Sequence, residues 1–175
     1  MKTHTNEIEE LVWERLSLVP DPEIPVISIT ELGVVRGVYW DGQQLRIVIT
    51  PTYTGCPAMQ LFVAEIRAAM HEQGFDDLVV ETVYSPAWTT DWISAEGRTK
   101  LLAYGIAPPG PTDPNVGAPV RFMPRRPGGF AAAAIACPQC GSSNTERLSA
   151  FGSTPCKALY RCLACREPFE HFKPI

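Results

Sequence analysis

The sequence predicts an α+β protein: a small α-β-β-α-β-α sandwich, a proline-rich linker and a C-terminal ribbon that carries four cysteines. Three observations lead to this prediction. Helical and strand-like apolar patterns alternate over residues 1–106, prolines and glycines crowd residues 107–130, and two Cys-x-x-Cys pairs lie in residues 131–175. We take these three ranges as the predicted domain, linker and ribbon.

Charge and cysteine content divide the chain in the same way. Residues 1–107 hold 7 Lys/Arg and 15 Asp/Glu, a formal charge of −8, whereas residues 108–175 hold 8 and 4, a formal charge of +4. One cysteine falls in the first 136 residues and five in the last 39. Two compositions in one short chain indicate two modules.

Composition also limits the location of the protein. The chain is 45% hydrophobic, which excludes wholesale disorder. Its longest apolar run, residues 130–137, is far shorter than the roughly 18 residues of a membrane span. The first ten residues lack the apolar stretch of a secretory signal. We therefore expect a cytoplasmic protein without a membrane segment.

The first element is predicted to be a helix. Asn6 and Glu9 form a plausible capping pair at its start, and Pro20 and Pro22 stop it. Its apolar residues recur at near-helical spacing: Ile8, Leu11, Val12, Leu16 and Val19.

A β-hairpin and a second helix are predicted next. Residues 33–40 and 44–50 are rich in apolar β-formers and flank Asp41-Gly42, the strongest short-range hairpin signal. Residues 58–73 follow helical spacing, with Pro57 suited to the first turn and Gly74 to the C-terminal cap.

A third strand and a last helix complete the sandwich. Residues 78–84 form the strand, which Pro86 ends, and residues 94–104 form the helix, which Gly105 closes. This order of elements predicts helices packed on one face of the sheet.

The linker is predicted from its prolines and glycines. Seven prolines and five glycines lie between Gly105 and Gly129, and neither residue favours helix or sheet. A semi-extended spacer is expected, and an ordered arm along the first module is the alternative.

The loop between the second strand and the second helix is the first candidate site. It reads Thr-Pro-Thr-Tyr-Thr-Gly-Cys-Pro from Thr50, and places Cys56 at or near a helix N-cap. Amides and the helix dipole there are expected to lower a thiol pKa. Gly55 permits a sharp turn, and Thr52 and Thr54 are candidates to donate hydrogen bonds to sulfur. A buried, inert Cys56 is an equally good interpretation.

A thiol-dependent enzyme is disfavoured, and we predict no catalytic residue. His71 lies on the helix that follows Cys56, about 20 Å along its axis at 1.5 Å per residue. His4 and His171 lie near the two ends of the chain, where an orienting shell is hard to build. A thiolate that binds or transfers a soft metal needs no base.

A second polar cluster, Asp-Pro-Glu-Ile-Pro, follows the first helix. Its prolines fix an extended turn that would present Asp21 and Glu23 together, although solvated acids at a helix end are the simpler interpretation.

These pieces together resemble a known family. The turn at Asp21–Pro25, Glu31-Leu-Gly33 before the first strand and the loop at Thr50–Ala58 are similar to the small α+β family of iron–sulfur assembly factors that includes SufT. The resemblance covers about residues 7–106. It implies a role in maturing iron–sulfur proteins, with Cys56 as the functional cysteine, Asp21 and Glu23 as its acidic turn, and a transient iron–sulfur cluster or iron as cargo.

The C-terminal cysteines predict a zinc ribbon. Their two Cys-x-x-Cys pairs are separated by 21 residues, a spacing that closes a tetrahedral site of four thiolates: Cys137, Cys140, Cys162 and Cys165. Gly141 is suited to a left-handed conformation that points amides at sulfur. Because all four ligands come from protein, one structural Zn²⁺ is expected, coupled to folding; a rubredoxin-like iron centre is the alternative.

Other residues of the ribbon leave alternatives open. Cys156 lies beside Lys157, which would stabilise a thiolate, but a half-buried strand residue is the simpler interpretation. Four thiolates on one divalent ion reduce the formal +4 to about +2, too little for a nucleic-acid partner. The aromatic residues are expected to form a small core or a protein-docking face: Phe151, Tyr160, Phe169 and Phe172.

The tail carries a second resemblance. Residues 151–162 and 166–173 are similar to the PaaD family, accessory proteins of the bacterial phenylacetyl-CoA epoxidase system. This resemblance implies partners among the oxygenase and reductase subunits, and a structural component of the oxygenase complex is the alternative role.

A lone Cys56 cannot fill a cluster's ligand set, so a homodimer or transfer within a complex is implied.

Overall fold

The protein consists of two compact units, residues 1–101 and 102–175. The structure is a computed structural model that describes residues 2–40, 42–112 and 135–175. The sequence-predicted boundary after residue 106 lies five residues beyond the boundary between the units, which falls inside helix α3 (Ala95–Tyr104). Among the described residues, no helix is both long and apolar enough to cross a membrane.

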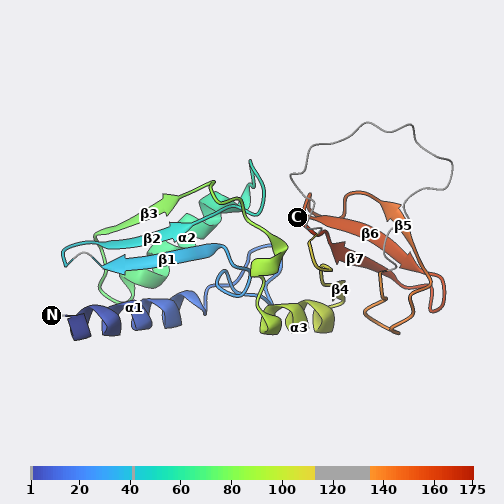
Figure 1. Cartoon of the computed structure of the whole chain (residues 1–175), viewed down its shortest axis with the longest axis horizontal. Helices are drawn as coiled ribbons and strands as arrows, with labels where there is room; N and C mark the ends of the chain where they lie inside the picture. The colour runs from blue at the N-terminus through green and yellow to red at the C-terminus, as the bar shows by residue number, and fades with distance from the viewer. Residues whose placement is uncertain (1, 41, 113–134) are drawn as a thin grey trace. The chain divides into compact units, whose positions relative to one another are not determined.

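The first unit contains a three-stranded sheet in the order β1-β2-β3 (Figure 1). Strands β1 (Val35–Trp40) and β2 (Leu45–Ile49) form the predicted antiparallel hairpin. Helix α2 (Ala58–His71) then carries the chain to β3 (Leu78–Thr82), which pairs with β2 in parallel. A parallel pair needs such a crossover connection, so the helix is a consequence of the strand order.

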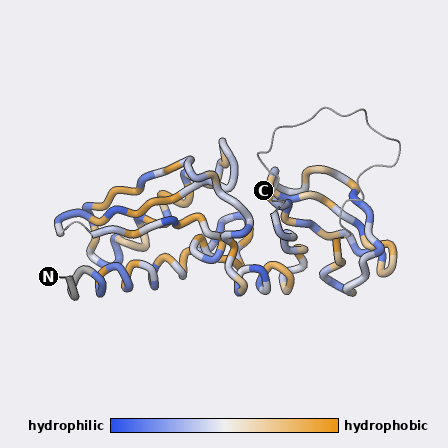
Figure 2. Tube along the Cα trace, in the orientation of Figure 1, coloured by the Kyte–Doolittle hydropathy of each residue, from blue (hydrophilic) through white to orange (hydrophobic). Residues whose placement is uncertain are grey.

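Two helices cover one face of this sheet. Helix α1 (Lys2–Leu16) packs against β1 and α2, and α2 packs against β3. The strands alternate between buried and exposed residues, and Figure 2 shows hydrophobic residues concentrated along them. Side chains of both helices and the inner sheet face form the core: Val12, Leu16, Val38, Leu45, Ile47, Ile49, Phe62, Ile66, Met70 and Leu78.

The start of α1 differs from the prediction. The helix begins at Lys2, so Asn6 and Glu9 lie inside it and the predicted capping pair is wrong. No glycine or proline in residues 2–5 breaks the helix there. Glu9 instead accepts a 3.4 Å hydrogen bond from the amide of Trp40, at the edge of the sheet.

The remaining elements of this unit follow the predicted order. Gly74 and Gly105 end α2 and α3 in left-handed conformations, with φ of +81° and +94°. A short 3₁₀-helix, η1 (Thr90–Trp92), precedes α3. The buried indole of Trp88 donates a 3.1 Å hydrogen bond to the Leu32 carbonyl and so anchors the connection after β3.

The second unit contains a four-stranded sheet in the order β4-β7-β6-β5. Strands β5 (Thr145–Ser149), β6 (Lys157–Cys162) and β7 (Pro168–Phe172) form an antiparallel ribbon. Strand β4 (Ile106–Ala107) pairs with β7 in parallel. Ile106, which the sequence assigns to the first domain, therefore belongs to this sheet.

Most of the predicted linker and the start of the predicted ribbon lie outside the described residues. Of residues 107–130, the structure describes 107–112, and of residues 131–175 it describes 135–175. The spacer and the ordered arm both stay predictions.

Candidate functional site

The loop that carries Cys56 connects the end of β2 to the start of α2. Gly55 adopts a φ of +88°, the left-handed conformation expected for the sharp turn. The Cys56 amide donates a 3.2 Å hydrogen bond to the Tyr53 carbonyl, and α2 begins two residues later. The Cys56 side chain is half-buried in front of this helix.

The environment of the Cys56 thiol differs from the one predicted. Burial raises its pKa, while hydrogen bonds from the Ala58 amide and the Thr52 side chain act in the opposite direction. The negative charges of Glu23 and Asp21 raise the pKa further. The net effect is a raised pKa, so the predicted lowering by the helix start is wrong. Loss of water and two nearby carboxylates outweigh the helix start.

The acidic turn has a defined geometry. Asp21 is 5% exposed, and its Oδ1 accepts hydrogen bonds from the amides of Glu23 at 2.8 Å and Ile24 at 2.7 Å. The Asp21 amide donates to the Ile27 carbonyl at 2.8 Å, which closes the turn. Asp21 therefore holds the turn together, and the exposed Glu23 projects from it near Cys56.

The structure brings four of the five predicted site residues together. Thr52 is buried and hydrogen-bonds to the thiol, and the charges of Asp21 and Glu23 act on it from the turn. Thr54 is exposed. His71 contacts Asp76 at the far end of α2 from Cys56, so the two side chains do not form a catalytic pair.

Thr50 was not among the site residues predicted from the sequence. Its side chain is 1% exposed, and within the described part of the chain its Oγ1 has no hydrogen-bond partner. The sequence does not show whether a hydroxyl at the end of a strand faces the protein interior or the solvent. Its place two residues before Thr52, in a loop with three threonines, is the signal that was available.

Neutralising Glu23 is expected to make Cys56 more reactive. Glu23→Gln removes a negative charge that disfavours the thiolate, so the pKa of Cys56 falls and alkylation at pH 7 becomes about two- to fivefold faster. Iodoacetamide labelling, followed by mass spectrometry of the Cys56 peptide, measures the rate. Glu72→Gln, an exposed carboxylate at the far end of α2, is the control. An unchanged rate in Glu23→Gln would show that its charge does not act on Cys56.

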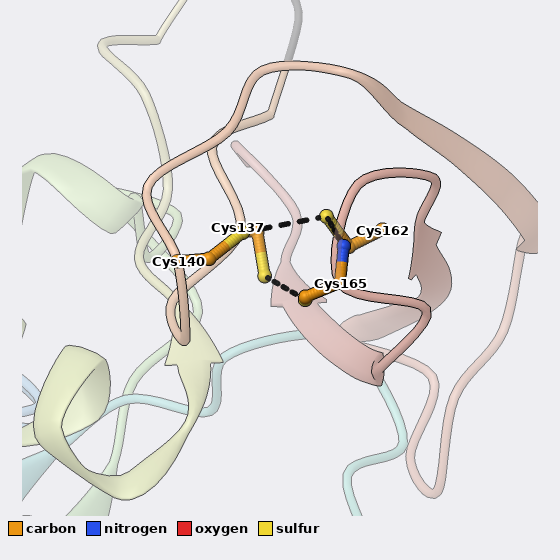
Figure 3. A group of neighbouring side chains, drawn as sticks. All are labelled: Cys137, Cys140, Cys162 and Cys165. Atoms are coloured by element: carbon orange, nitrogen blue, oxygen red, sulfur yellow. Dashed lines mark hydrogen bonds between the residues drawn. The ribbon is translucent and has the colours of Figure 1, made fainter.

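The second site is a cluster of four cysteines in the C-terminal unit (Figure 3). The four Sγ atoms all lie within 4.8 Å of one another, with separations between the pairs of 3.7 Å (Cys137–Cys165) and 3.6 Å (Cys140–Cys162). A tetrahedron of thiolates around zinc, with Zn–S bonds of about 2.3 Å, has edges of about 3.8 Å. The four thiolates therefore fit one zinc ion.

Two equivalent turns hold these cysteines. In the first, the Gly141 amide donates to the Cys137 carbonyl at 2.9 Å, and Gly141 has the predicted left-handed φ, +71°. In the second, the Arg166 amide donates to the Cys162 carbonyl at 3.0 Å, and Arg166 has a left-handed φ of +72°. The Cys165 amide lies 3.5 Å from the Cys162 sulfur and donates a hydrogen bond to it. The pKa of Cys162 is lowered to about 6, and this hydrogen bond is the largest cause.

The left-handed residues make a stability prediction. A side chain in this conformation costs about 1 kcal/mol, so Arg166→Gly is expected to stabilise the C-terminal unit by about that amount and Gly141→Ala to destabilise it similarly. Resistance of the bound metal to a competing chelator should change in the same two directions. A change in the same direction for both substitutions would contradict the left-handed conformation of these two positions.

The cluster is backed by a small apolar core. It consists of buried Ala107, Cys137, Cys162 and Phe169, with Ile135 and Tyr160 packed against it. Cys156 lies outside the cluster: it is 6% exposed, and the Thr154 hydroxyl is 3.0 Å from its sulfur. Neighbouring Lys157 is buried and forms a 2.8 Å ion pair with Glu170.

The Cys56 site and the four-cysteine cluster differ in their ligand sets. Within the described residues, the four ribbon cysteines form the one group of three or more cysteine, histidine or acidic side chains with ligand atoms this close together. The Cys56 site thus offers a sulfur without a preformed cage, whereas the ribbon offers a closed one.

Comparison with known proteins also separates the part of the chain that carries Cys56 from the ribbon that carries the four cysteines. Residues 9–81 match the family model described as iron–sulfur cluster assembly protein, and residues 124–173 match the PaaD zinc beta ribbon domain. The crystal structure of a DUF59 domain from Bacillus anthracis superposes with a TM-score of 0.54 and 24% identity, covering 58% of this chain and 97% of that domain. That likeness supports the fold of the first unit.

Two curated relatives cover different lengths of the chain. The Fe-S protein maturation auxiliary factor YitW of Bacillus subtilis is 35% identical, over 57% of this chain and 95% of its own. A protein of Escherichia coli K12 that is named as a subunit of 1,2-phenylacetyl-CoA epoxidase is 45% identical, over 94% of this chain and 92% of its own. The chain therefore belongs to the PaaD family of phenylacetyl-CoA epoxidase proteins, in which an iron–sulfur assembly domain is joined to a zinc ribbon.

Proposed function

We propose that this protein is a non-catalytic accessory protein of aerobic phenylacetate degradation. It assists maturation of an iron–sulfur or di-iron centre of the phenylacetyl-CoA epoxidase complex, in the cytoplasm, and its partners are the oxygenase and reductase subunits. Its relatives carry the names of an epoxidase subunit and of iron–sulfur maturation factors. The observation that carries the proposal is the grouping of Asp21, Glu23 and Thr52 around one half-buried cysteine at a helix start.

This site suits transient binding of its cargo. Cys56 supplies one sulfur, which binds a free iron or an iron atom of a cluster by ligand exchange. The iron–sulfur bond forms as the bond from iron to the displaced ligand breaks, the thiol proton leaves with that ligand, and no oxidation state changes. The raised pKa of Cys56 favours the return of that proton, and therefore release. The ligands that Cys56 cannot supply come from a second chain or from the client.

Thr52 and Asp21 have supporting roles in this proposal. The Thr52 hydrogen bond stabilises negative charge on sulfur when the cargo is bound. Asp21 fixes the turn from which Glu23 reaches the site, because its carboxylate is bonded to two backbone amides.

Anaerobic reconstitution with iron and sulfide tests the role of Cys56. We expect wild-type protein to gain iron and a visible charge-transfer spectrum, and Cys56→Ala to lose at least about nine-tenths of both, with its zinc content unchanged. Cys156→Ala, which removes a cysteine outside both Cys-x-x-Cys pairs, is the control and should load like wild type. Identical iron binding by wild type and Cys56→Ala would refute the role of Cys56.

The zinc ribbon has a structural role in this proposal. Its ligands are Cys137, Cys140, Cys162 and Cys165, and four protein ligands leave no position for a reacting water. The ribbon would position a client beside the assembly domain. Catalysis by zinc is therefore not part of the function.

A structural component of the oxygenase complex is the second candidate, because the relative matched over 94% of this chain is named as part of the epoxidase. Epoxidase activity separates the two roles. Maturation predicts that a complex purified from cells containing this protein stays active after the protein is removed. A structural role predicts loss of activity on removal and recovery when the protein is added back.

A further inference from the structure

A cavity of about 210 Å³ lies in the first unit, between the end of α1 and the outer side of α2. Its walls are largely apolar, from Leu18, Val19, Pro20, Ala68 and Ala69. Leu18, one of these lining residues, is 68% exposed. The pocket is half open to solvent, and its volume exceeds the about 150 Å³ of a closed cavity that holds benzene, so there is room in it for a single phenyl ring.

Three charged side chains complete the walls and define what fits there. Arg15 lines the cavity, and its Nε is buried without a hydrogen-bond partner among the described residues. Glu65 and Glu72 are exposed and supply two negative charges. A matching occupant therefore carries an apolar ring and a nearby cation for the two carboxylates.

The turn between β5 and β6 presents both features. Phe151 is 63% exposed, and the Lys173 ammonium lies 4.6 Å from the centre of its ring. Lys173 also donates to the Ala150 carbonyl at 3.2 Å. An exposed ring, a cation and the carbonyls of a turn are thus displayed together.

This turn is also held in place before any partner binds. The Gly152 amide donates to the Lys157 carbonyl at 2.8 Å, and Glu170 accepts hydrogen bonds from the amide and hydroxyl of Ser153. Glu170 is itself fixed by its ion pair with buried Lys157. Because the turn is already ordered, inserting Phe151 into a partner costs little conformational entropy.

We propose that Phe151 of one copy of the protein occupies the α1/α2 cavity of a second copy, with Lys173 beside Glu65 and Glu72. The two surfaces differ, so the contact is heterologous and closes as a reciprocal pair or a ring. One aromatic anchor buries less area than a standard stable interface, so we expect reversible self-association at micromolar or higher concentration. The inference does not depend on the proposed function.

Sedimentation velocity of the full chain over a concentration series tests this interface. We expect wild type to self-associate, and Phe151→Ala to weaken association at least tenfold. Ala69→Phe, which fills the cavity from α2, should do the same. Tyr84→Ala, which removes another aromatic side chain that is 64% exposed, is the matched control and should associate like wild type.

Two further experiments test whether these particular residues meet: reversing the charges of Lys173 and Glu72, and mixing two variants. Lys173→Glu should weaken association, and Glu72→Lys in the same chain should restore part of it. An equal mixture of Phe151→Ala and Ala69→Phe keeps one intact contact, from the Phe151 of the second to the cavity of the first, and should form heterodimers. Zinc content and circular dichroism verify that each variant is folded.

Three outcomes would overturn the proposal. The first is wild type that stays monomeric up to millimolar concentration. The second is association that Ala69→Phe weakens but Phe151→Ala does not, since another segment would then occupy the cavity. The third is an equal mixture of the two variants that forms no heterodimer, since the contact would then not join two copies.

Discussion

Replacing Cys162 with serine is expected to abolish zinc binding and unfold the C-terminal unit. Cys162 is fully buried, lies at the end of β6 and belongs to the apolar core that backs the cluster. Binding of structural zinc contributes about 10–16 kcal/mol in small zinc domains, which exceeds the few kcal/mol that a core this small supplies. The apo ribbon should therefore be unfolded.

Zinc analysis and ¹H–¹⁵N spectra check this result. Zinc should fall from one ion per chain to none, and the dispersed signals of residues 145–172 should collapse, while those of the first unit remain. Cys156→Ser is the matched control: it also changes a buried cysteine of this unit, but one outside the cluster, and should keep its zinc. A folded, zinc-loaded Cys162→Ser protein would contradict the assignment. A red, iron-loaded wild type would support the rubredoxin-like alternative.

Replacing Asp21 with alanine is expected to cost the first unit about 2–4 kcal/mol. The carboxylate satisfies the amides of Glu23 and Ile24, and the alanine variant leaves both without this acceptor, in a turn where Asp21 and Ile24 are buried. The same change should loosen the turn that carries Glu23, so Cys56 alkylation at pH 7 should become faster as two negative influences on its thiol weaken.

Urea denaturation and the alkylation rate provide separate readouts for this variant. Asp21→Asn keeps an oxygen acceptor and should lose only about 1 kcal/mol, since the turn is retained while the charge is removed. Both variants should alkylate faster than wild type. An alanine variant as stable as wild type would show that water replaces the carboxylate and that Asp21 does not hold the turn.

Sequence reasoning succeeded where the relevant groups are close together in the chain. The hairpin around Gly42, the glycine that ends α2 and the two Cys-x-x-Cys turns each depend on a few consecutive residues. The left-handed backbone conformation of Arg166 is the exception in the ribbon, because arginine, unlike glycine, gives no indication of that conformation in the sequence.

The chemical state of Cys56 could not be predicted in this way. The sequence shows a cysteine before a helix, and that position alone favours a lowered pKa. In the structure, the turn at Asp21, 35 positions earlier in the sequence, places two carboxylates near the thiol, and burial removes water from it. Desolvation of the thiol, with a smaller contribution from the charges of the distant turn, raises its pKa.

Four features of this protein are readable in its sequence: the two modules, the order of the elements in the first, the four cysteines of the ribbon and the loop of Cys56. Each of these is encoded by spacing or periodicity within a short segment. Three others arise from the folded chain: Asp21 caps a turn, the Cys56 thiol has a raised pKa and Ile106 joins the ribbon sheet. Burial and pairing between distant segments are properties of the folded chain, and no local pattern contains them.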